Sequence, residues 1–417
     1  MKDNITCIIS ACPDTYSGYG ERSLDFIKEL IRIRPDWDIK LLSQRWGECR
    51  MGYLADHNET DLISRIIPKL TEQPDVWIQI TVPNEFQAVG KFNIGVTAAM
   101  ETTICDSSWV QGCNRMNLIL VSSNHSKFSL TNSKYLDNRT NETLEVTTPI
   151  EVLFEGIDKS KYHTLNKNYR SPVLEGLTSD WNFLCVGHWL SGDFGEDRKN
   201  IGYTIKTFLE TFKDKDNAPG LVLKISRGSS SIMDREDVLN RIYSIRESVH
   251  YTKSLPQIFL LHGDLTDDEV NSIYNDTRIK AMVSFTKGEG YGRPLAEFAA
   301  IGKPVLCSGW SGQVDFLNKE LTPLIGGTIE KVHPSAVVEH MILKEASWFR
   351  PDDNQVTLGF NQVYERYVFW KAKAQKQADI INTKFSKAEM GNRLSEYIDS
   401  YVPKFPVEVP FNFPHKD

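Results

Sequence analysis

The segment from Val283 to Phe316, VSFTKGEGYGRPLAEFAAIGKPVLCSGWSGQVDF, constrains the fold of this chain more than any other. An apolar run predicts a strand over 281–285, and the loop after it carries three glycines. We expect a helix from Pro294 to Ile301, because proline is favoured in a first turn and Gly302 ends the pattern. A second strand over 304–307 and a second glycine-rich loop, SGWSG, follow. This order is far more specific than an isolated glycine-rich run.

The glycine-rich loop and the helix after it have the properties of an anion site. Glycines let the backbone approach a ligand closely, and a helix start offers free N–H groups and the positive end of its dipole. Glu289 in the loop and Glu297 in the helix would repel phosphate, so we expect them to accept hydrogen bonds from sugar or ribose hydroxyls. The pattern predicts a site for a diphosphate and a sugar. The alternative is a surface turn with two solvated acids.

The spacing of these acids carries a family resemblance. Seven residues separate Glu289 from Glu297, and GEGYGRPLAEFAAIGKPV resembles the donor-site segment of retaining GT-B glycosyltransferases of the family-four type. In that family the first acid contacts the donor sugar, the following glycine backbone contacts the diphosphate, and the second acid holds the nucleotide ribose. The resemblance gives these roles, in that order, to Glu289, to Gly290, Tyr291 and Gly292, and to Glu297.

Length and composition bound the remaining possibilities. A chain of 417 residues favours two domains, and a net charge of −7 gives no overall basic field for nucleic acid. No apolar run of membrane-spanning length occurs, so we expect no stable membrane insertion. The seven cysteines are scattered without a CxxC pair, which argues against a metal site and favours a reducing, cytoplasmic location.

The first half of the chain has the alternating pattern of a Rossmann-like domain. A strand over 5–10 leads into a loop with Gly18 and Gly20 and then an amphipathic helix. The resemblance places Gly18 opposite the donor phosphates; the alternative is a plain turn between strand and helix. We expect a helix over 62–70 and further strands over 38–43, 75–81, 92–98, 118–122 and 150–157.

The loop after the strand at 92–98 is the candidate acceptor side. Ligands bind where parallel strands end, and AMETTICDSSW lies there. Many relatives carry a functional histidine near this point, but this chain has none, so Glu101 is the substitute candidate for a catalytic role. The alternative is that Glu101 caps a helix. We expect His125 to lie in a helix cap rather than to act as a base.

The second half begins after a polar crossover at 159–180. A strand over 183–186 is followed by GHWLSGDFGEDRKN, in which Arg198 and Lys199 precede a helix and suit phosphate binding. In the family this loop supplies two basic residues to the diphosphate. Lys199 matches one, His188 stands in place of the other, and Arg198 is the compensating candidate. The alternative is a solvated basic helix start.

The remaining elements complete the second domain. We expect strands over 221–225 and 258–261 and a helix over 234–248, and the resemblance implies a nucleobase site near 263–265. The segment 324–330 and then a helical series to about Tyr401 should follow, and the resemblance implies that 386–401 packs back on the first domain. The expected division is an acceptor domain over 1–160, joined by 386–417, and a donor domain over 180–385.

Together these features predict an α/β protein with the GT-B fold, in which two Rossmann-like domains face each other across a cleft. The resemblance implies transfer of a sugar from a nucleotide diphosphate sugar to a hydroxyl, with retention and without a metal or further cofactor. The acceptor is a surface or lipid-linked glycan, or a hydroxymethylated DNA base in a virus. The alternatives are a nucleotide-sugar epimerase and a non-catalytic GT-B-like binding protein. Oligomeric state is not indicated.

Overall fold

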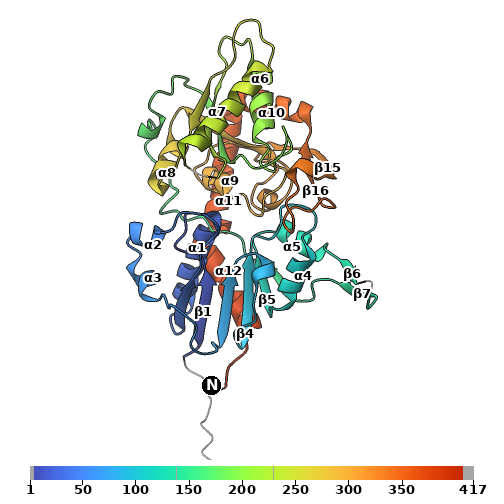
Figure 1. The fold of residues 1–417 in the computed structure, drawn as a ribbon. Helices are drawn as coiled ribbons and strands as arrows, with labels where there is room; N and C mark the ends of the chain where they lie inside the picture. The colour runs from blue at the N-terminus through green and yellow to red at the C-terminus, as the bar shows by residue number, and fades with distance from the viewer. Residues whose placement is uncertain (1–3, 138, 229, 407–417) are drawn as a thin grey trace, which may run out of the picture.

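The computed structural model describes residues 4–137, 139–228 and 230–406 and contains two six-stranded parallel sheets, one above the other in Figure 1. The first sheet has the order β2-β1-β3-β4-β5-β8. Its strands are β1 (Thr6–Ala11), β2 (Asp38–Ser43), β3 (Val76–Ile80), β4 (Phe92–Thr97), β5 (Leu118–Val121) and β8 (Ile150–Val152). The helices of this half are α1 (Gly18–Ile33), α2 (Tyr53–Asp56), α3 (Thr60–Ser64), α4 (Ser107–Asn114) and α5 (Asn124–Thr131). A hairpin of β6 (Tyr135–Asp137) and β7 (Glu142–Leu144) projects from its side (Figure 1).

The second sheet has the order β11-β10-β9-β12-β13-β14, which is the order of dinucleotide-binding domains. Its strands are β9 (Asn182–His188), β10 (Gly220–Ser226), β11 (Ile258–Leu261), β12 (Ile279–Ser284), β13 (Val305–Ser308) and β14 (Leu324–Ile325). The helices are α6 (Ile201–Phe212), α7 (Ile232–Glu247), α8 (Asp267–Asn275), α9 (Arg293–Ala300), α10 (Asp353–Glu365), α11 (Tyr367–Lys384) and α12 (Lys387–Tyr401). Short 3₁₀ turns lie at Pro83–Glu85, Pro172–Leu174, Gly312–Asp315 and Pro334–Ala336.

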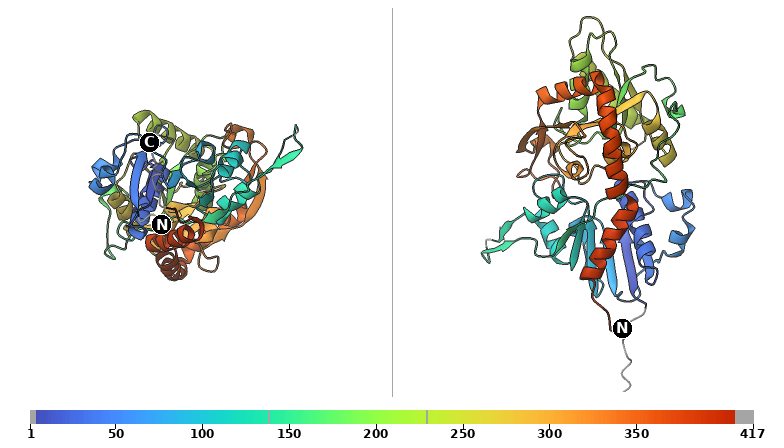
Figure 2. Two further views of the ribbon diagram at one scale, coloured as in Figure 1. Left: turned by 90° about the horizontal axis from the view of Figure 1, so that it is seen from below. Right: turned by 180° about the vertical axis from the view of Figure 1, so that it is seen from behind.

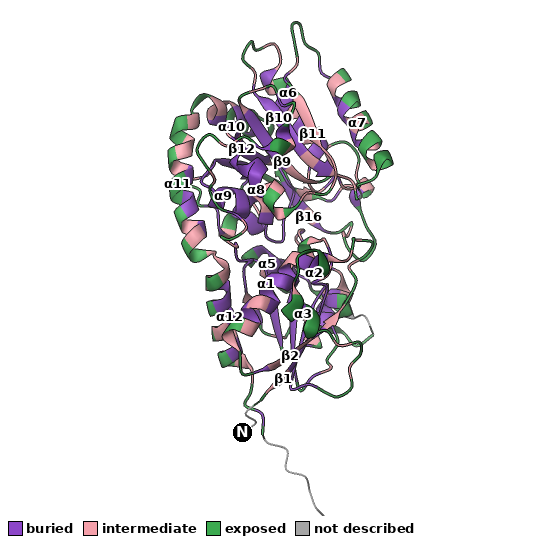
Figure 3. Ribbon diagram, turned by 90° about the vertical axis from the view of Figure 1, so that its left-hand side faces the viewer, coloured by how far each residue is buried: buried purple, intermediate pink, exposed green. Residues whose placement is uncertain are grey.

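The central strands of both sheets are largely apolar because helices cover both faces of each sheet. All four residues of β5, LILV, are buried, as are the first four of β9. Figure 3 shows this arrangement, with buried strands inside and exposed residues on the outer helix faces. One apolar cluster includes Leu120 of β5, Leu184 of β9 and Tyr291, so it continues from one half of the molecule into the other. The two halves therefore pack closely.

Most strands expected from the sequence are confirmed to within two residues, and three elements differ. The strand expected over 150–157 ends at Val152, and the helix expected over 62–70 is only α3, which ends at Ser64. Pro68 explains the second difference, because proline lacks a backbone N–H and disfavours helix at the residue before it. The helical series expected after 330 begins only at α10.

Residues 327–351 form an antiparallel pair instead of that helical series. It joins β15 (Gly327–Lys331) to β16 (Ser347–Pro351), with Ile329 opposite Phe349. β-branched and aromatic residues favour a pleated strand, and Trp348 is fully buried in this one. The prediction of helix was therefore wrong for the residues of this strand pair.

The chain crosses between the halves twice, and the two crossings lie side by side. The first is the segment from 153 to 181, and the second joins α11 to α12, which run along the back of the molecule (Figure 2, right). Ile157 N–H donates to the Phe385 carbonyl at 2.9 Å, and Lys387 N–H donates to the Ile157 carbonyl at 3.0 Å. α12 then packs against α1 of the first half. Among the described residues, no helix has the length and apolar character that crossing a bilayer demands.

Gly156 permits the close approach of these crossings, and its replacement tests their packing. A Cβ at Gly156 would lie 2.5 Å from the Lys387 Cα, which is backbone and cannot rotate away. We expect Gly156→Ala to lower the unfolding free energy by about 1–3 kcal/mol, measured by thermal and urea unfolding. Gly228→Ala is the control, because a Cβ there meets nothing within 4 Å. Equal stability of the two variants would contradict the close packing.

Candidate active site

Loops from both halves bring four charged side chains to one point. Glu289 lies between β12 and α9, Arg198 and Lys199 precede α6, and Glu101 follows β4. Lys199 Nζ lies 2.7 and 2.8 Å from the two carboxylate oxygens of Glu289. One terminal nitrogen of Arg198 lies 3.0 Å from Glu101 Oε1 and 3.4 Å from Glu289 Oε2. The structure thus places these four sequence-predicted residues in one ion-pair cluster.

The cluster is internally neutralised. Burial raises the pKa of Glu289, but Lys199 and Arg198 outweigh it and hold that pKa below its ordinary value. Burial alone would lower the pKa of Arg198. The charges of Glu101 and Glu289 outweigh burial, so the net shift of that pKa is upward. Two cations therefore face two carboxylates, and Glu289 is ionised at neutral pH.

The start of α6 fixes the two cations. Asn200, the residue before the helix, has a left-handed φ of +56°, a conformation that asparagine tolerates better than most residues. The Asn200 side chain makes no capping hydrogen bond to the helix. The Arg198 carbonyl accepts a hydrogen bond from Lys287 N–H at 2.7 Å, which ties this loop to the glycine-rich loop. The backbone under Arg198 and Lys199 is therefore held in place.

The glycines of the 288–292 loop serve the contact between the two halves. A Cβ at Gly288 would lie 2.1 Å from the Glu101 carbonyl oxygen, and one at Gly290 would lie 2.9 Å from that of Ala98. Gly292 has φ +98° and precedes α9, whose N-terminus has no side-chain cap. Pro294 has no N–H, and Leu295 N–H donates to the Gly292 carbonyl at 3.0 Å, so α9 offers an anion the positive end of its dipole rather than a set of free N–H groups.

Of the two glycines at the start of α1, close packing requires Gly20 rather than Gly18. A Cβ at Gly20 would lie 2.1 Å from the Thr15 carbonyl oxygen, whereas one at Gly18 would meet nothing within 4 Å. Ser17 caps the helix by accepting from Gly20 N–H at 2.9 Å. Gly18 instead lines the cavity between the halves.

That cavity has a volume of about 280 Å³ and contains most of the predicted site. It is lined by Gly18, Tyr19, Arg22, Trp46, Ala98, Glu101, Glu155, Arg198, Glu289, Gly290, Tyr291, Gly292, Arg293 and Pro294. Glu289 also borders a much smaller space beside Lys199 and Leu295. The carboxylate of Glu289 thus lies between the two spaces.

Two sequence-predicted residues lie away from this cluster. His188 is exposed at the end of β9, with Nδ1 3.1 Å from the Ser226 hydroxyl. Partial desolvation and the nearby cations, Lys199 first, lower the pKa of His188. Gly263 has φ +116°, and its carbonyl accepts from Lys224 Nζ at 2.8 Å. Neither residue is hydrogen-bonded to Glu289.

Glu297 is paired with Arg293, a residue that the sequence analysis did not single out. Its Oε1 lies 2.9 Å from Arg293 Nε, and the same nitrogen lies 2.9 Å from Glu21 Oε2. A terminal nitrogen of Arg293 lies 2.8 Å from Asp25 Oδ2. Glu21 and Asp25 belong to α1, so Arg293 links the α9 acid to the first half. The available signal was a cation at the first position of a helix, where the dipole disfavours it unless carboxylates compensate.

Burial dominates the titration of this second cluster. It raises the pKa of Glu297 to about 8, although Arg293 opposes the shift, and Glu21 adds to it by repulsion. Burial likewise raises the pKa of Glu21. Three carboxylates therefore compete for one guanidinium, and Glu297 retains a proton at neutral pH.

Two alternatives for the acceptor side are resolved. α4 is capped by Asp106, which accepts from Ser108 N–H at 2.9 Å, so the proposal that Glu101 caps that helix is wrong. His125 follows Ser123, the cap of α5, as expected for a cap-region residue. Burial lowers the pKa of His125 to about 4, so it is neutral.

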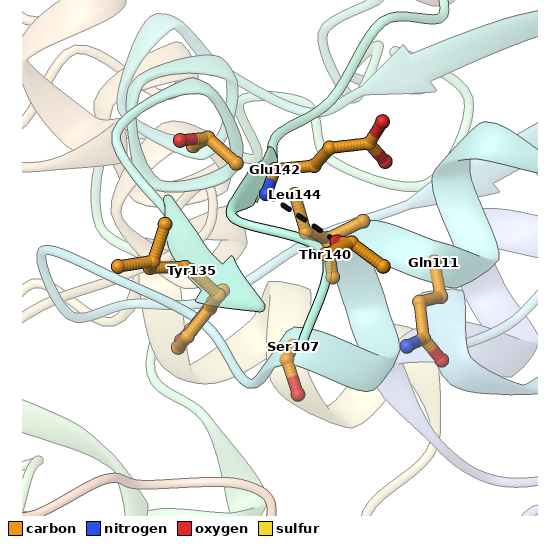
Figure 4. Close-up of a pocket in the computed structure, with 8 residues that line it drawn as sticks. Ser107, Gln111, Tyr135, Thr140, Glu142 and Leu144 are labelled. Carbon is orange, nitrogen blue, oxygen red and sulfur yellow. Dashed lines mark hydrogen bonds between the residues drawn. The ribbon is translucent and has the colours of Figure 1, made fainter. Parts of the chain in front are cut away.

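A separate cavity of about 420 Å³ lies under the β6–β7 hairpin (Figure 4). Ser107 and Gln111 of α4 face Thr140, Glu142 and Leu144 across it. None of the sequence-predicted site residues lines it. In the described part of the chain, no group of three or more His, Cys, Asp or Glu side chains is arranged to hold a metal ion.

Removing Arg293 tests whether it compensates the three carboxylates. We expect Arg293→Met to lower the unfolding free energy by about 3–5 kcal/mol at pH 8. Without the guanidinium the folded state binds protons more tightly than the unfolded chain, so the loss should shrink as pH falls towards 5.

Arg170→Met, which breaks an exposed pair with Asp180, is the matched control and should cost at most about 1 kcal/mol at either pH. Chemical unfolding at both pH values gives these differences. An Arg293→Met loss that is small, or that does not change with pH, would contradict the account.

Comparisons with known proteins identify the fold. A scan against models of protein families finds no match, and a search of curated proteins finds none either. Solved structures do match over nearly the whole chain. HepE of Anabaena in complex with UDP-glucose superposes with a TM-score of 0.61 at 11% identity, over 95% of this chain and 100% of that one.

Two further structures agree. A glycosyltransferase from Rickettsia africae has a TM-score of 0.60 at 12% identity, over 96% of this chain and 99% of that one. Sucrose-phosphate synthase of Thermosynechococcus elongatus has a TM-score of 0.56 at 10% identity, over 96% of this chain and 99% of that one. With the two parallel sheets, these likenesses confirm the predicted α/β architecture: the fold is GT-B, with two Rossmann-like domains facing each other across a cleft.

Proposed function

We propose that this protein is a retaining glycosyltransferase of the family-four type, which moves a sugar from a nucleotide diphosphate sugar to a hydroxyl acceptor. The observation that carries the proposal is the ion-pair cluster of Lys199, Arg198 and Glu289 next to the uncapped start of α9. Arg198 and Glu289 line the interdomain cavity, and Lys199 borders the smaller space beside it. HepE, a structural neighbour, is described with bound UDP-glucose. Retention and the family-four assignment rest on the Glu-x7-Glu motif formed by Glu289 and Glu297.

In this proposal the donor diphosphate takes over the two cations. Glu289 holds Lys199 and Arg198 in the free protein, but a diphosphate brings more negative charge and the same hydrogen-bond acceptors. The N–H groups of Gly290, Tyr291 and Gly292 and the start of α1 at Gly18 would add to its binding. The released Glu289 carboxylate can then accept hydrogen bonds from the donor sugar.

The chemical step needs stabilisation of the leaving group. The bond from the anomeric carbon to the diphosphate oxygen breaks, the acceptor oxygen bonds to that carbon, and the acceptor proton passes to the departing diphosphate oxygen. Lys199 and Arg198 would stabilise the charge that develops on the diphosphate. Glu101 faces them from the first half, where an acceptor hydroxyl can donate a hydrogen bond to its carboxylate.

The remaining assignments follow from this reaction. Residues 1–160 with α12 would be the acceptor domain, and 180–385 the donor domain. Glu297 would hold the ribose once Arg293 has released the Glu297 carboxylate. No metal or further cofactor is part of the proposal. A cytoplasmic location is supported by seven unpaired cysteines, six of them buried.

Replacement of Glu289 tests the site directly. We expect Glu289→Ala to lower kcat by about 10²–10³-fold, because the carboxylate that orients the donor sugar is lost. Glu289→Gln keeps the shape and one acceptor oxygen and should lose less. Lys199→Ala should show a comparable loss to Glu289→Ala. Glu210→Ala, an exposed acid on α6, is the matched control and should keep normal turnover.

Turnover is measured as nucleotide release from UDP-, GDP- and ADP-sugars with a mixture of hydroxyl acceptors. Near-normal turnover of Glu289→Ala would remove that residue from the site. Conversion of the donor sugar into its epimer without an acceptor would indicate the epimerase instead.

The pKa of Glu297 gives a second test. A ribose hydroxyl donates to the carboxylate form, which forms as pH rises through about 8. We therefore expect the affinity for the nucleoside diphosphate to rise between pH 7 and pH 9, measured by titration calorimetry. Glu297→Gln should bind more weakly and lose this rise. A wild-type affinity that is flat over this range would contradict a ribose contact by Glu297.

A further inference from the structure

Lys287 is a buried cation that the proposed reaction does not use. Its side chain is only 2% exposed, and its ammonium nitrogen lies 3.0 Å from Glu330 Oε1 and 3.3 Å from Glu196 Oε2. The same nitrogen lies over the ring of Trp348, 5.3 Å from its centroid. A buried ammonium group costs free energy unless it is paired, so the two carboxylates are the reason that Lys287 can lie here.

Lys287 also joins the two loops of the proposed donor site. Its backbone N–H donates to the Arg198 carbonyl at 2.7 Å, and its carbonyl accepts from Phe349 N–H of β16 at 3.0 Å. The hydroxyl of Thr286, the residue before it, donates to the same Arg198 carbonyl at 3.2 Å. The main chain at Lys287 is therefore fixed against the loop that carries Arg198 and Lys199, and its ammonium group has a defined place beneath that loop.

Two acids directly precede the two cations of that loop, because the sequence from 196 to 199 is Glu-Asp-Arg-Lys. Glu196 pairs with Lys287, and the described residues give it no second cation. Glu330, the other partner of Lys287, also lies 3.5 Å from Arg350. Loss of the Lys287 charge would therefore leave Glu196 uncompensated, while Glu330 would keep a cation beside it.

Asp197 lies close to the same lysine. It is 1% exposed and accepts from Ile201 N–H at 3.4 Å, at the start of α6. Burial raises the pKa of Asp197 to about 6, and the hydrogen bond from Ile201 and the charge of Lys287 limit that rise. Lys287 thus favours the carboxylate form that holds the start of α6, next to the two cations.

These contacts have an electrostatic consequence for an anion at the donor site. An uncompensated carboxylate two residues from Arg198 and three from Lys199 would repel a diphosphate and compete with it for both cations. Lys287 lines neither the interdomain cavity nor the smaller space beside it, and it is nearly inaccessible. Its effect on a bound anion is therefore indirect and passes through Glu196.

We propose that Lys287 is a positioning residue of the donor site, which engages Glu196 so that Arg198 and Lys199 are available to a nucleoside diphosphate. This inference rests on the proposed function, because it concerns the donor of that reaction. It gives Lys287 no contact with the ligand and no part in the chemical step.

Binding measurements separate this role from a purely structural one. UDP, GDP and ADP are titrated against the wild type by calorimetry, and the tightest of them is compared, by competition, with its nucleoside, which has no phosphates. We expect Lys287→Met to weaken the diphosphate about tenfold and the nucleoside less than about twofold, because only the diphosphate meets the uncompensated carboxylate. A lysine that served stability alone would affect both ligands equally.

A second substitution tests whether Lys287 acts through Glu196. The double variant Lys287→Met with Glu196→Gln lacks both charges and should bind the diphosphate within about twofold of the wild type. Lys287→Met with Glu330→Gln should remain about tenfold weaker, because Glu196 is still uncompensated in it. Equal binding by the two double variants would overturn the assignment to Glu196.

Lys303→Met is the matched control for the loss of a buried lysine. Lys303 lies beyond the end of α9 and donates to the carbonyls of Asp276 and Ile279, both at 2.8 Å. We expect this variant to keep the wild-type ratio between the affinities for diphosphate and nucleoside, whatever its thermal stability.

The outcomes distinguish this inference from the proposed function. A Lys287→Met variant that fails to fold, that weakens both ligands equally, or that binds the diphosphate normally would overturn the role of Lys287 alone. A wild type that binds none of the three diphosphates would overturn the proposed function, and the role of Lys287 with it.

Discussion

The contact between the two halves of this protein depends on the buried guanidinium of Arg293. It compensates Glu297 of its own helix and Glu21 and Asp25 of α1, so it joins the two halves at the point where the cavity lies. Lys387 of α12 extends the network, because it lies 3.5 Å from Asp25 and 2.9 Å from Asp158 at the first crossing. Charges on α9, α1, α12 and the crossing are thus held in one chain of contacts. A ligand that needs the Glu297 carboxylate must compete with this contact.

A similar competition governs the first cluster. Lys199, Arg198, Glu289 and Glu101 neutralise one another in the free protein, which keeps buried charges satisfied until a ligand replaces them. In our proposal the donor diphosphate displaces Glu289 from the cations, and the ribose displaces Arg293 from Glu297. Both exchanges replace an internal ion pair by a ligand contact, so the binding side chains already lie at the site, but the ion pairs between them must break when the ligand binds.

The sequence predicted the fold well because buried parallel strands are apolar throughout and glycine-rich turns mark where they end. The same local signals found Glu289, Arg198 and Lys199, which lie next to strands or at a helix start. They failed at β16, where the adjacent aromatic residues Trp348 and Phe349 were taken for part of a helical series, and at α3, which Pro68 shortens. Arg293 was missed for another reason: its role depends on contacts with α1 of the opposite half.

The central claim is that residues 289–297 and Lys199 form a nucleotide-sugar site, and thermal unfolding with added nucleotides tests it most directly. UDP, GDP and ADP and their glucose derivatives would be titrated against the wild type and Lys199→Ala. The account predicts that one nucleotide raises the melting temperature of the wild type in a concentration-dependent way, and that Lys199→Ala loses most of this rise. No rise with any of these ligands would contradict the claim and would favour a non-catalytic role for the fold.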